Sequence, residues 1–499
     1  MLISIRPRKH SLVLYSFLFA NLALLSACGG SYNGGNNSGG GSQQGAPIIA
    51  ATMPPSGIVN SAYSFIFAVS SGGQAPFSWS ETGALPAGLT LASNGKLSGT
   101  PTASGSFPIT VKVEDSASQT ATKDFSIEID SAPSFRFSFT GSMATPRFLH
   151  TATLLSSGHV LVAGGKDDTG NATATAELYD PGTGTFSAAA NTLTYARFSH
   201  TATLLNDGNV LFAGGTGLTS ASLSSAEIYD PGAGTFSSTA GTMTTARSQH
   251  TDTLLNDGTV LIAGGVDASG NALDTAEIYH PATQTFTATA GKMTAARFQH
   301  TATILDAGAV LLTGGVDATG FTTATAEIYD PTTGNFTPTD SMSDSRAQHS
   351  AIAIGLGSVL VAGGYSSDAQ TVTALASGQS YNSSFTPLLT NMVEPRAQYT
   401  ITSLGTGIFV LTGGAKFVLA NCGNNCVTWV PQSLSSAEGF SSFDLDFFPE
   451  VSMNIARRGH TATLLGDGSK ILIVGGANST LGPRNQLVDT ILSSAELFH

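Results

Sequence analysis

The 499-residue chain has few charged side chains, and basic ones are the rarer kind. Charged residues make up 11% of the sequence, with 20 Lys and Arg against 33 Asp and Glu, so the formal net charge at pH 7 is −13. Proteins that bind nucleic acid or anionic lipid surfaces present basic side chains to the phosphates. The composition therefore argues against both kinds of partner.

Cysteine, tryptophan and long apolar runs are also scarce. The chain has three Cys and two Trp, and beyond its first 27 residues no stretch is long and apolar enough to span a membrane. Gly, Ser, Thr and Ala are abundant instead, which suits a β-rich exported protein. The length indicates several domains or one large repeat array.

The one long apolar run lies at the N-terminus. Three basic residues at positions 6–9 precede an apolar stretch from 11 to 25, and the segment Leu25-Ser26-Ala27-Cys28 follows. Charge followed by a short apolar stretch is typical of a secretory signal. The segment resembles the lipobox of bacterial lipoproteins, which implies a signal peptide over residues 1–27 and a lipid-modified N-terminus at Cys28. An ordinary signal peptide followed by a chance cysteine is the alternative.

Cleavage before Cys28 would remove three basic side chains and no acidic ones, taking the net charge from −13 to −16. Residues 28–45 are almost entirely Gly, Ser, Asn and Gln and cannot bury apolar surface, so we expect a flexible tether. Lipid chains would attach the protein to a membrane of the bacterial cell envelope without a spanning helix. Gly29 is not the Asp that resembles an inner-membrane retention signal, which favours the outer membrane, on its periplasmic or surface face.

Residues 46–131 show alternating apolar positions separated by turn signals. Residues 63–69 alternate, as do the positions from Phe107 to Val113, and Asn94-Gly95 is a hairpin signal. This pattern predicts a small β-sandwich. The segment LPAGLTLASNGKLSGTP resembles the Ig-like modules of bacterial surface proteins, which implies a spacer role. Related cadherin-like domains bind calcium, but the acidic motif around Glu114 is incomplete.

Residues 134–499 repeat one unit. The unit reads M-x-x-x-R-x-x-H-T-A-T-L-L, a turn, V-L-x-A-G-G, a variable loop, A-E-I-Y-D-P and T-F, and its seven copies are spaced by 50, 50, 50, 49, 50 and 61 residues. A period near fifty with four strand-like segments is typical of a propeller blade. The unit resembles the kelch repeat. We therefore predict an all-β chain in which an Ig-like β-sandwich precedes a seven-bladed kelch-type β-propeller.

The two ends of the repeat region complement each other. The last copy stops at residues 495–499 without its fourth strand, and an unassigned strand-like segment, SFRFSFT, stands at residues 134–140 before the first copy. Joined, the two segments complete one blade. We expect the N-terminal strand to close the ring, which leaves no open edge between the first and last blades.

The repeated Arg and His have two interpretations. They could form a ring around a central funnel that binds anionic sugars, or each Arg could be structural, paired with the Glu of its own blade. We favour the structural role because a residue present in every blade is usually part of the blade and a buried Arg needs a partner; Gln379 and Tyr399 replace the repeated Glu and His in one blade each. The assigned residues are Arg147, Arg197, Arg247, Arg297, Arg346, Arg396 and Arg457, with Glu177, Glu227, Glu277, Glu327, Glu438 and Glu496.

Function is expected where the copies differ, in the loops after each Gly-Gly pair. The sixth copy is the most divergent: it carries Cys422 and Cys426, which predict a local disulfide with a metal site as the alternative. It also carries Trp429, a contact residue for sugar or protein, or a cover for its own blade edge. The candidate ligand-binding residues are Lys166, Asp168, Asp267, Asp317, Tyr365, Lys416, Trp429 and Arg484.

Two functions remain open. The first is a non-catalytic, lipid-anchored binding protein that recognises a glycan or an envelope or extracellular protein and needs no cofactor or metal. The second is a sugar-active enzyme, because kelch propellers also occur in mutarotases and in galactose-oxidase-like copper enzymes. The copper sites of those oxidases use a Tyr-linked Cys and two His. Here all three Cys have other roles, and only His159, His280 and His499 of the propeller histidines lie outside the repeat. The sequence carries no signal for oligomeric state.

Overall fold

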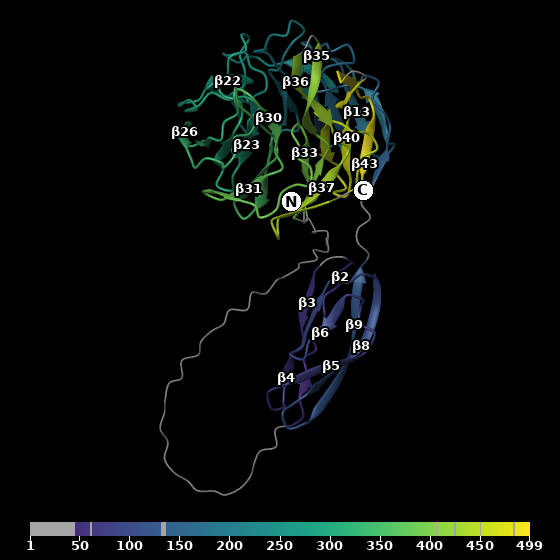
Figure 1. The fold of residues 1–499 in the computed structure, drawn as a ribbon. Coiled ribbons are helices and arrows are strands. Elements are labelled where there is room, and N and C mark those ends of the chain that lie inside the picture. Colours follow the sequence, from purple (N-terminus) through teal and green to yellow (C-terminus); the bar gives the residue numbers. More distant parts are fainter. Residues whose placement is uncertain are drawn as a thin grey trace, which may run out of the picture. The chain divides into compact units, whose positions relative to one another are not determined.

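The computed structural model describes residues 45–59, 62–130, 136–405, 407–423, 426–449, 451–482 and 485–499, without the side chains of 421–427 and 449. All of its regular structure is β, and the chain divides at residue 132 into two compact units (Figure 1). No helix in the described part is long and apolar enough to cross a membrane. The predicted lipidation site, Cys28, lies outside the described residues.

The first unit is a β-sandwich. One sheet has the order β2-β9-β8-β5 and the other the order β3-β7-β6, with a short β1-β4 pair beside them. The alternating side chains predicted from the sequence face inward, and Trp79, Val111 and Ile127 are among the buried residues of its core. The strands are β1 (Ile48–Ile49), β2 (Gly57–Ile58), β3 (Tyr63–Ile66), β4 (Val69–Ser71), β5 (Ser78–Gly83), β6 (Leu89–Leu91), β7 (Lys96–Gly99), β8 (Gly105–Glu114) and β9 (Thr120–Asp130).

The second unit consists of seven four-stranded antiparallel sheets, which we call blades 1 to 7. Blade 1 has β11 (Thr151–Leu154), β12 (Val160–Ala163), β13 (Ala176–Asp180) and β14 (Thr185–Ala188). Blade 2 has β15 (Thr201–Leu204), β16 (Val210–Ala213), β17 (Ala226–Asp230) and β18 (Thr235–Ser238). Blade 3 has β19 (Thr251–Leu254), β20 (Val260–Ala263), β21 (Ala276–His280) and β22 (Thr285–Ala288). Blade 4 has β23 (Thr301–Ile304), β24 (Val310–Thr313), β25 (Ala326–Asp330) and β26 (Asn335–Pro338).

The last three blades carry an extra hairpin each, between their second and third strands. Blade 5 has β27 (Ser350–Gly355), β28 (Ser358–Ala362), β31 (Gly378–Tyr381) and β32 (Phe385–Pro387), with the hairpin β29 (Tyr365–Ser367) and β30 (Val372–Ala374). Blade 6 has β33 (Thr400–Ser403), β34 (Ile408–Thr412), β37 (Ala437–Ser441) and β38 (Asp446–Pro449), with β35 (Ala415–Gly423) and β36 (Cys426–Ser433). Blade 7 has β39 (Thr461–Leu464), β40 (Ile471–Val474), β43 (Ala495–Phe498) and β10 (Phe137–Phe139), with β41 (Ala477–Leu481) and β42 (Leu487–Ile491).

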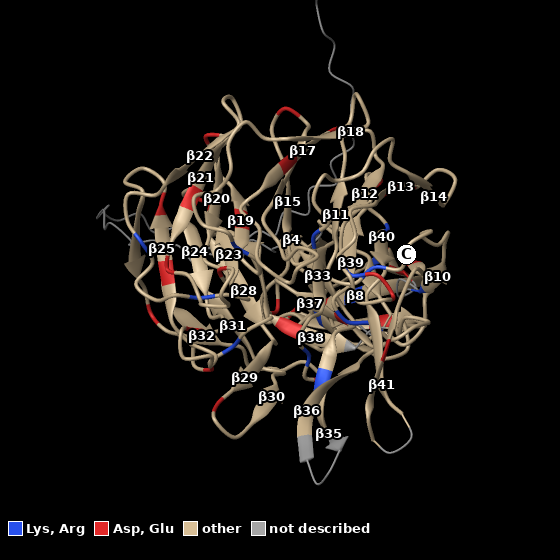
Figure 2. Cartoon of the chain, turned by 90° about the horizontal axis from the view of Figure 1, so that it is seen from above, with Lys and Arg blue, Asp and Glu red and all other residues tan. Residues whose placement is uncertain are grey.

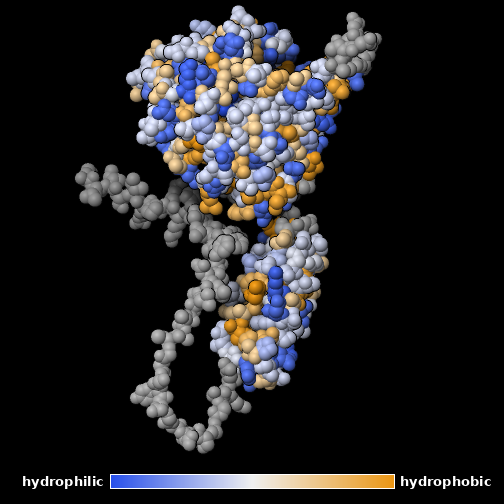
Figure 3. Space-filling view, turned by 60° about the vertical axis from the view of Figure 1, so that its left-hand side comes forward, coloured by the Kyte–Doolittle hydropathy of each residue, from blue (hydrophilic) through white to orange (hydrophobic). Residues whose placement is uncertain are grey.

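The blades close into a ring around a central axis (Figure 2). The first strand of each blade lies beside the first strands of its two neighbours, and β39 of blade 7 lies beside β11 of blade 1. Apolar side chains of the second and third strands fill the spaces between blades, as Leu161, Phe212 and Tyr229 do between blades 1 and 2. The visible propeller surface mixes hydrophilic and hydrophobic residues (Figure 3).

The ring is closed by a strand from the N-terminal side of the propeller. Blade 7 has the order β10-β43-β40-β39, with Phe137 opposite Phe498 and Phe139 opposite Glu496. The two ends of the repeat region thus complete one blade. The predicted closure by an N-terminal strand is confirmed, and it supplies β43 with the partner that would otherwise be missing at the sheet edge.

The Gly-Gly pairs have a steric reason. In blade 1, Gly164 and Gly165 have φ angles of +64° and +98°, a region that side chains rarely adopt. A Cβ on Gly164 would lie 2.6 Å from the carbonyl oxygen of Arg197 in blade 2. The pair therefore lets the end of β12 approach the backbone of the next blade, where the Gly165 N–H donates to that same carbonyl at 2.8 Å.

Candidate functional site

The repeated arginines lie inside the blades. Arg147 is fully buried, and its Nη1 donates to the carbonyl oxygens of Gly164 and Thr175 at 2.9 and 2.8 Å. Its Nη2 lies 3.0 Å from the carboxylate of Glu177, which also accepts the backbone N–H of Ala144. Burial lowers the pKa of Arg147, and the hydrogen bond and charge of Glu177 oppose that shift. The same ion pair recurs in blades 2, 3, 4, 6 and 7, so these guanidinium groups are occupied.

In blade 5 the buried Arg pairs with a different carboxylate. Gln379 stands where the other blades have Glu, and Arg346 pairs with Asp344 at 3.2 Å. The Gln379 amide donates to the Ser343 hydroxyl at 2.8 Å and accepts that residue's backbone N–H at 3.2 Å. A buried Arg thus keeps an acidic partner in every blade, as its desolvation requires.

Two residues after each repeated Arg, the chain passes through a left-handed conformation. These seven positions, which we call the axial ring, have φ angles between 50° and 57°. Each backbone N–H donates to the carbonyl oxygen of the corresponding residue in the preceding blade at 2.9 to 3.3 Å, and the chain of bonds closes from blade 1 to blade 7. The axial ring consists of Leu149, Ser199, Gln249, Gln299, Gln348, Gln398 and Gly459.

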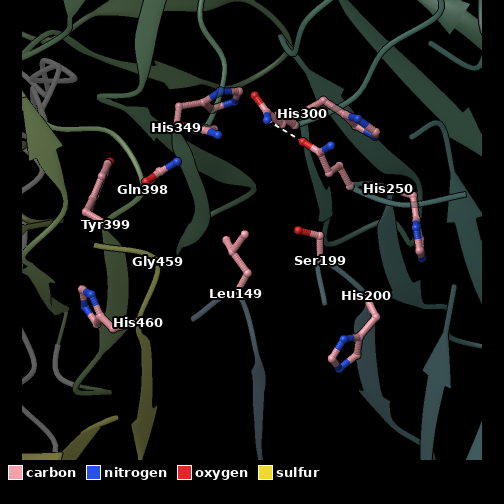
Figure 4. Close-up of a pocket in the computed structure, with 13 residues that line it drawn as sticks. Leu149, Ser199, His200, His250, His300, His349, Gln398, Tyr399, Gly459 and His460 are labelled. Atoms are coloured by element: carbon pink, nitrogen blue, oxygen red, sulfur yellow. Dashed lines mark hydrogen bonds between the residues drawn. The ribbon is translucent and has the colours of Figure 1, made fainter. Parts of the chain in front are cut away.

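The axial ring borders a cavity of about 350 Å³ on the propeller axis (Figure 4). The cavity opens on the side that carries the connections between second and third strands, which we call the b–c face. On that face an isolated bridge joins Phe148 to Lys166, directly after the Gly-Gly pair. The remaining lining residues are Tyr399 and five of the six repeated histidines, all but His150. No Asp, Glu, Lys or Arg of the described chain lines the cavity.

The histidines around the cavity are part of the joints between blades. Nε2 of His200 lies 3.0 Å from the Thr151 hydroxyl of the preceding blade, and the other five repeat this contact with an equivalent Thr. In blade 6, Tyr399 replaces His, and its hydroxyl donates to the Ala362 carbonyl at 2.6 Å. Burial lowers the pKa of His150 to about 3 and holds the pKa of His200, His300, His349 and His460 well below its usual value. These five imidazoles are therefore neutral at physiological pH.

One histidine has a carboxylate neighbour. Asp252 of β19 lies 3.4 Å from His250 Nε2, with its side chain 2% exposed, and both of its carboxylate oxygens lack hydrogen-bond partners. Five other blades have Ala at this position. The His250 side chain is fully buried as well. This pair is the one acid–base combination next to the cavity in the described chain, and both of its side chains are buried.

Four consecutive blades contribute glutamine to the axial ring, and we call Gln249, Gln299, Gln348 and Gln398 the glutamine arc. Gln299 donates through Nε2 to the amide oxygen of Gln249, the bond drawn in Figure 4. Gln299 Oε1 accepts the Tyr365 hydroxyl at 3.0 Å. Gln398 Oε1 accepts Nη1 of Arg458 at 2.9 Å. The glutamine arc is thus an ordered polar surface, held from outside the axial ring by a phenol and a guanidinium.

The hairpins of blades 5, 6 and 7 stand next to one another on the b–c face. β30 lies beside β35, and β36 beside β41. The Ser433 hydroxyl donates to the Ala477 carbonyl at 2.9 Å and accepts the Ser479 N–H at 2.8 Å, which ties two of the hairpins together. The three hairpins form a continuous wall on the side of the cavity where the glutamine arc ends.

Trp429 belongs to this wall. It pairs across the strands with Leu419, and residues directly opposite share one face of a hairpin. Phe417 lies two residues before Leu419 and so shares that face. The Phe417 ring contacts Tyr365 with centroids 5.5 Å apart. An apolar stripe therefore runs from Trp429, which is 37% exposed, down to the tyrosine that holds Gln299.

None of the other candidate residues in the described chain lines the cavity. Nζ of Lys166 sits 4.3 Å from the ring centroid of Phe198, and Asp168 is exposed. Asp267 and Asp317 accept backbone N–H groups within their own turns, and Lys416 is half-buried on β35. Arg484 and the side chains of Cys422 and Cys426 lie outside the described residues. Of the predicted ligand-binding residues in the described chain, only Tyr365 contacts a residue of the axial ring, Gln299. Trp429 is connected to Tyr365 through the apolar stripe.

The axial ring itself was not among the predicted site residues. In the motif R-x-x-H the second x is the axial position. It varies between the copies, so it is not part of the repeated pattern. Its variation was the available signal: Leu, Ser, four Gln and Gly at a position flanked by constant residues. Arg458 carried a similar signal, because the corresponding residues are aromatic or small in the other blades.

The donor set of the described residues does not fit a copper site. No group of three or more His, Cys, Asp and Glu in the described chain is placed to hold a metal ion. The histidines around the cavity direct Nε2 to threonine hydroxyls, and their Nδ1 atoms are buried. Copper in proteins prefers several converging imidazole or thiolate ligands.

Comparisons with known proteins identify the architecture of both units. The family model "Putative Ig domain" matches residues 46–130. A solved structure of a fungal alcohol oxidase of the AA5 family, in complex with copper, matches at 16% identity and a TM-score of 0.54, over 73% of this chain and 75% of that chain. The structure of YjhT matches at 15% identity and a TM-score of 0.45, over 59% of this chain and 100% of that chain. No curated protein matches the sequence. The predicted all-β fold, a sandwich followed by a seven-bladed kelch-type propeller, is confirmed, and at these identities the likeness extends to the fold alone.

Proposed function

We propose that the propeller is a non-catalytic binding module that recognises a saccharide at the cavity on the b–c face. One observation carries the proposal: four consecutive blades place amide side chains around a cavity whose described lining contains no carboxylate, ammonium or guanidinium group. Amides bind hydroxyl and carbonyl groups through hydrogen bonds without adding charge. A cavity of about 350 Å³ is in the range of small-ligand sites.

The hairpin wall would extend the site beyond the cavity. Trp429 and Leu419 expose apolar surface on the hairpin wall, and aromatic side chains on rigid strands are effective contact residues. A saccharide longer than one residue would place its first unit in the cavity and further units along the stripe. We also propose that the signal and lipobox attach this module through Cys28 to the cell envelope, with the sandwich as spacer.

A glycan array tests the proposal with two forms of the protein, wild type and Gln348→Trp. The Gln348 amide makes no hydrogen bond within the described part of the chain, so an indole there would fill the cavity without removing a hydrogen bond. We expect wild type to bind at least one class of saccharide and Gln348→Trp to lose that binding at an unchanged melting temperature. Equal binding by both forms would place the ligand elsewhere.

The second candidate, a sugar-active enzyme, is favoured by one observation, the pair His250 and Asp252 beside the cavity. General acid–base catalysis needs a proton-transferring atom within hydrogen-bond reach of the substrate. Asp252→Ala separates the two functions. Turnover of a bound saccharide by wild type that disappears in Asp252→Ala would support the enzyme. Binding that is equal in both proteins, without turnover, supports the binding module.

A further inference from the structure

We propose that the glutamine arc is a hydrogen-bond donor site for a carbonyl or carboxylate oxygen on the saccharide. This inference rests on the proposed function and names the chemistry that the cavity selects. Its basis is the direction of the hydrogen bonds that already hold the four amides. They occupy amide oxygens more than amide nitrogens.

The backbone of the axial ring is not available to a ligand. Each of the seven N–H groups donates to the carbonyl of the preceding blade, and the bonds form a closed circle. A buried backbone group that is already paired gains little from a second partner. Recognition in the cavity therefore depends on the side chains of the axial ring.

Arg458 fixes the orientation of Gln398. A guanidinium can only donate hydrogen bonds, so the atom 2.9 Å from its Nη1 must be the amide oxygen. Arg458 is 6% exposed and is held by Ser479 and by Asp489, which accept from Nε and Nη2. It cannot turn away. Both N–H groups of Gln398 are left for the cavity, and the charge-assisted bond to its oxygen makes them stronger donors.

Tyr365 gives the other end of the arc the same polarity. Its hydroxyl donates to Gln299 Oε1, and burial raises the pKa of Tyr365 to about 12, so the proton is present at any physiological pH. Gln299 in turn donates to the oxygen of Gln249. The nitrogen of Gln249 and one N–H of Gln299 remain without partners in the described chain. Three of the four amides thus have occupied oxygens and free N–H groups.

The opposite side of the cavity has no amide, and its only polar side chain in the axial ring is the hydroxyl of Ser199. Leu149, Ser199 and Gly459 complete the axial ring there (Figure 4). Gly459 has a φ of +55°, and a Cβ at this position would overlap the ring of Phe148. A ligand that places an oxygen acceptor against the glutamine arc and a C–H face against Leu149 and Gly459 would match the two sides of the cavity. N-acyl and uronic acid sugars share that chemistry.

The test compares three classes of saccharide on the same array: those with a uronic acid, those with an N-acetyl group, and those with neither. The best binder of each class is then titrated against wild type, Gln398→Glu and Gln284→Glu. Glu at position 398 would pair with Arg458 and present only acceptors to the cavity. Gln284 lies in a turn between β21 and β22, away from the cavity, so it controls for the added charge.

We expect at least one of the two oxygen-bearing classes to bind wild type tenfold or more tightly than the unsubstituted class. Gln398→Glu should lower that affinity at least tenfold, and Gln284→Glu should not change it. The class that binds identifies the oxygen as carboxylate or acyl. Equal affinity for all three classes, or an unchanged affinity in Gln398→Glu, would overturn the inference while leaving saccharide binding intact. Absence of saccharide binding to wild type would overturn the proposed function itself.

Discussion

The carboxylate of Asp252 lies 3.4 Å from His250 Nε2, in the packed space between blades 2 and 3, without a hydrogen bond to either oxygen. Its cross-strand partner is Ile262, and five other blades have Ala at this position. A buried charge with one imperfect partner costs more than it contributes. We predict that Asp252→Ala raises the free energy of unfolding by about 1–3 kcal/mol.

Urea denaturation at pH 7.5 measures this, with the exposed Asp257→Ala as the matched control. If Asp252→Ala instead loses stability, the pair with His250 is a net stabilising contact and the interpretation of this site is wrong.

The repeated Arg should be structural. Arg247→Met leaves the buried carboxylate of Glu277 without its guanidinium, so we expect a loss of about 3–5 kcal/mol. Adding Glu277→Gln removes that charge, and blade 5 already accommodates Gln379 at the equivalent position. The double variant should therefore recover part of the loss. Thermal unfolding of the three proteins tests this. An unchanged melting temperature in Arg247→Met, together with lost ligand binding, would show that the repeated arginines bind the ligand and are not structural.

The buried histidines predict a steep loss of stability in acid. Burial holds the pKa of His200, His300 and three others below the ordinary value near 6.5, so below that pH the unfolded chain binds more protons than the folded one. This contribution is fully present above pH 6.5 and is lost as the pH falls. Each such His adds a slope of about 1.4 kcal/mol per pH unit.

Urea midpoints between pH 8 and 5 measure the slope. His300→Tyr copies the natural replacement at Tyr399. Because it removes one titrating group, it should reduce the slope by about 1.4 kcal/mol per pH unit. A stability that is flat down to pH 5 would show that the folded protein protonates these rings.

Ring closure by β10 predicts unequal effects of two truncations. Removing residues 1–132 deletes the first unit and leaves the propeller complete, so we expect little change in propeller stability. Removing residues 1–141 also deletes β10, exposes the edge of β43 and uncovers Phe498, against which Phe137 packs. We expect a lower melting temperature and aggregation of the shorter form. Calorimetry and size-exclusion chromatography compare the two, and equal behaviour would show that the closure is dispensable.

Much of the fold can be predicted from the sequence because the same structural unit is encoded seven times. The Gly-Gly pairs, the turns and the missing fourth strand of the last copy each correspond to one local requirement of the backbone. The cavity could not be predicted from the sequence, because the residues that line its axial ring differ from blade to blade. The axial ring depends on a left-handed residue whose identity the backbone does not restrict, so Leu149, Gln249 and Gly459 look unrelated in the sequence.

The glutamine arc also depends on contacts between distant positions. Arg458 meets Gln398 across 60 residues and Tyr365 meets Gln299 across 66. No local pattern connects such pairs, whereas Trp429 was detectable because its hairpin is an insertion in an otherwise regular copy.

The most direct test of the account is hydroxyl-radical footprinting of the protein with and without the saccharide that the array identifies. We predict that the ligand protects Leu149 in the axial ring and Trp429 on the hairpin wall, while Leu356 and Phe443, exposed on turns away from the b–c face, react as before. Protection of Leu356 or Phe443, with Leu149 unchanged, would contradict a binding site at the cavity.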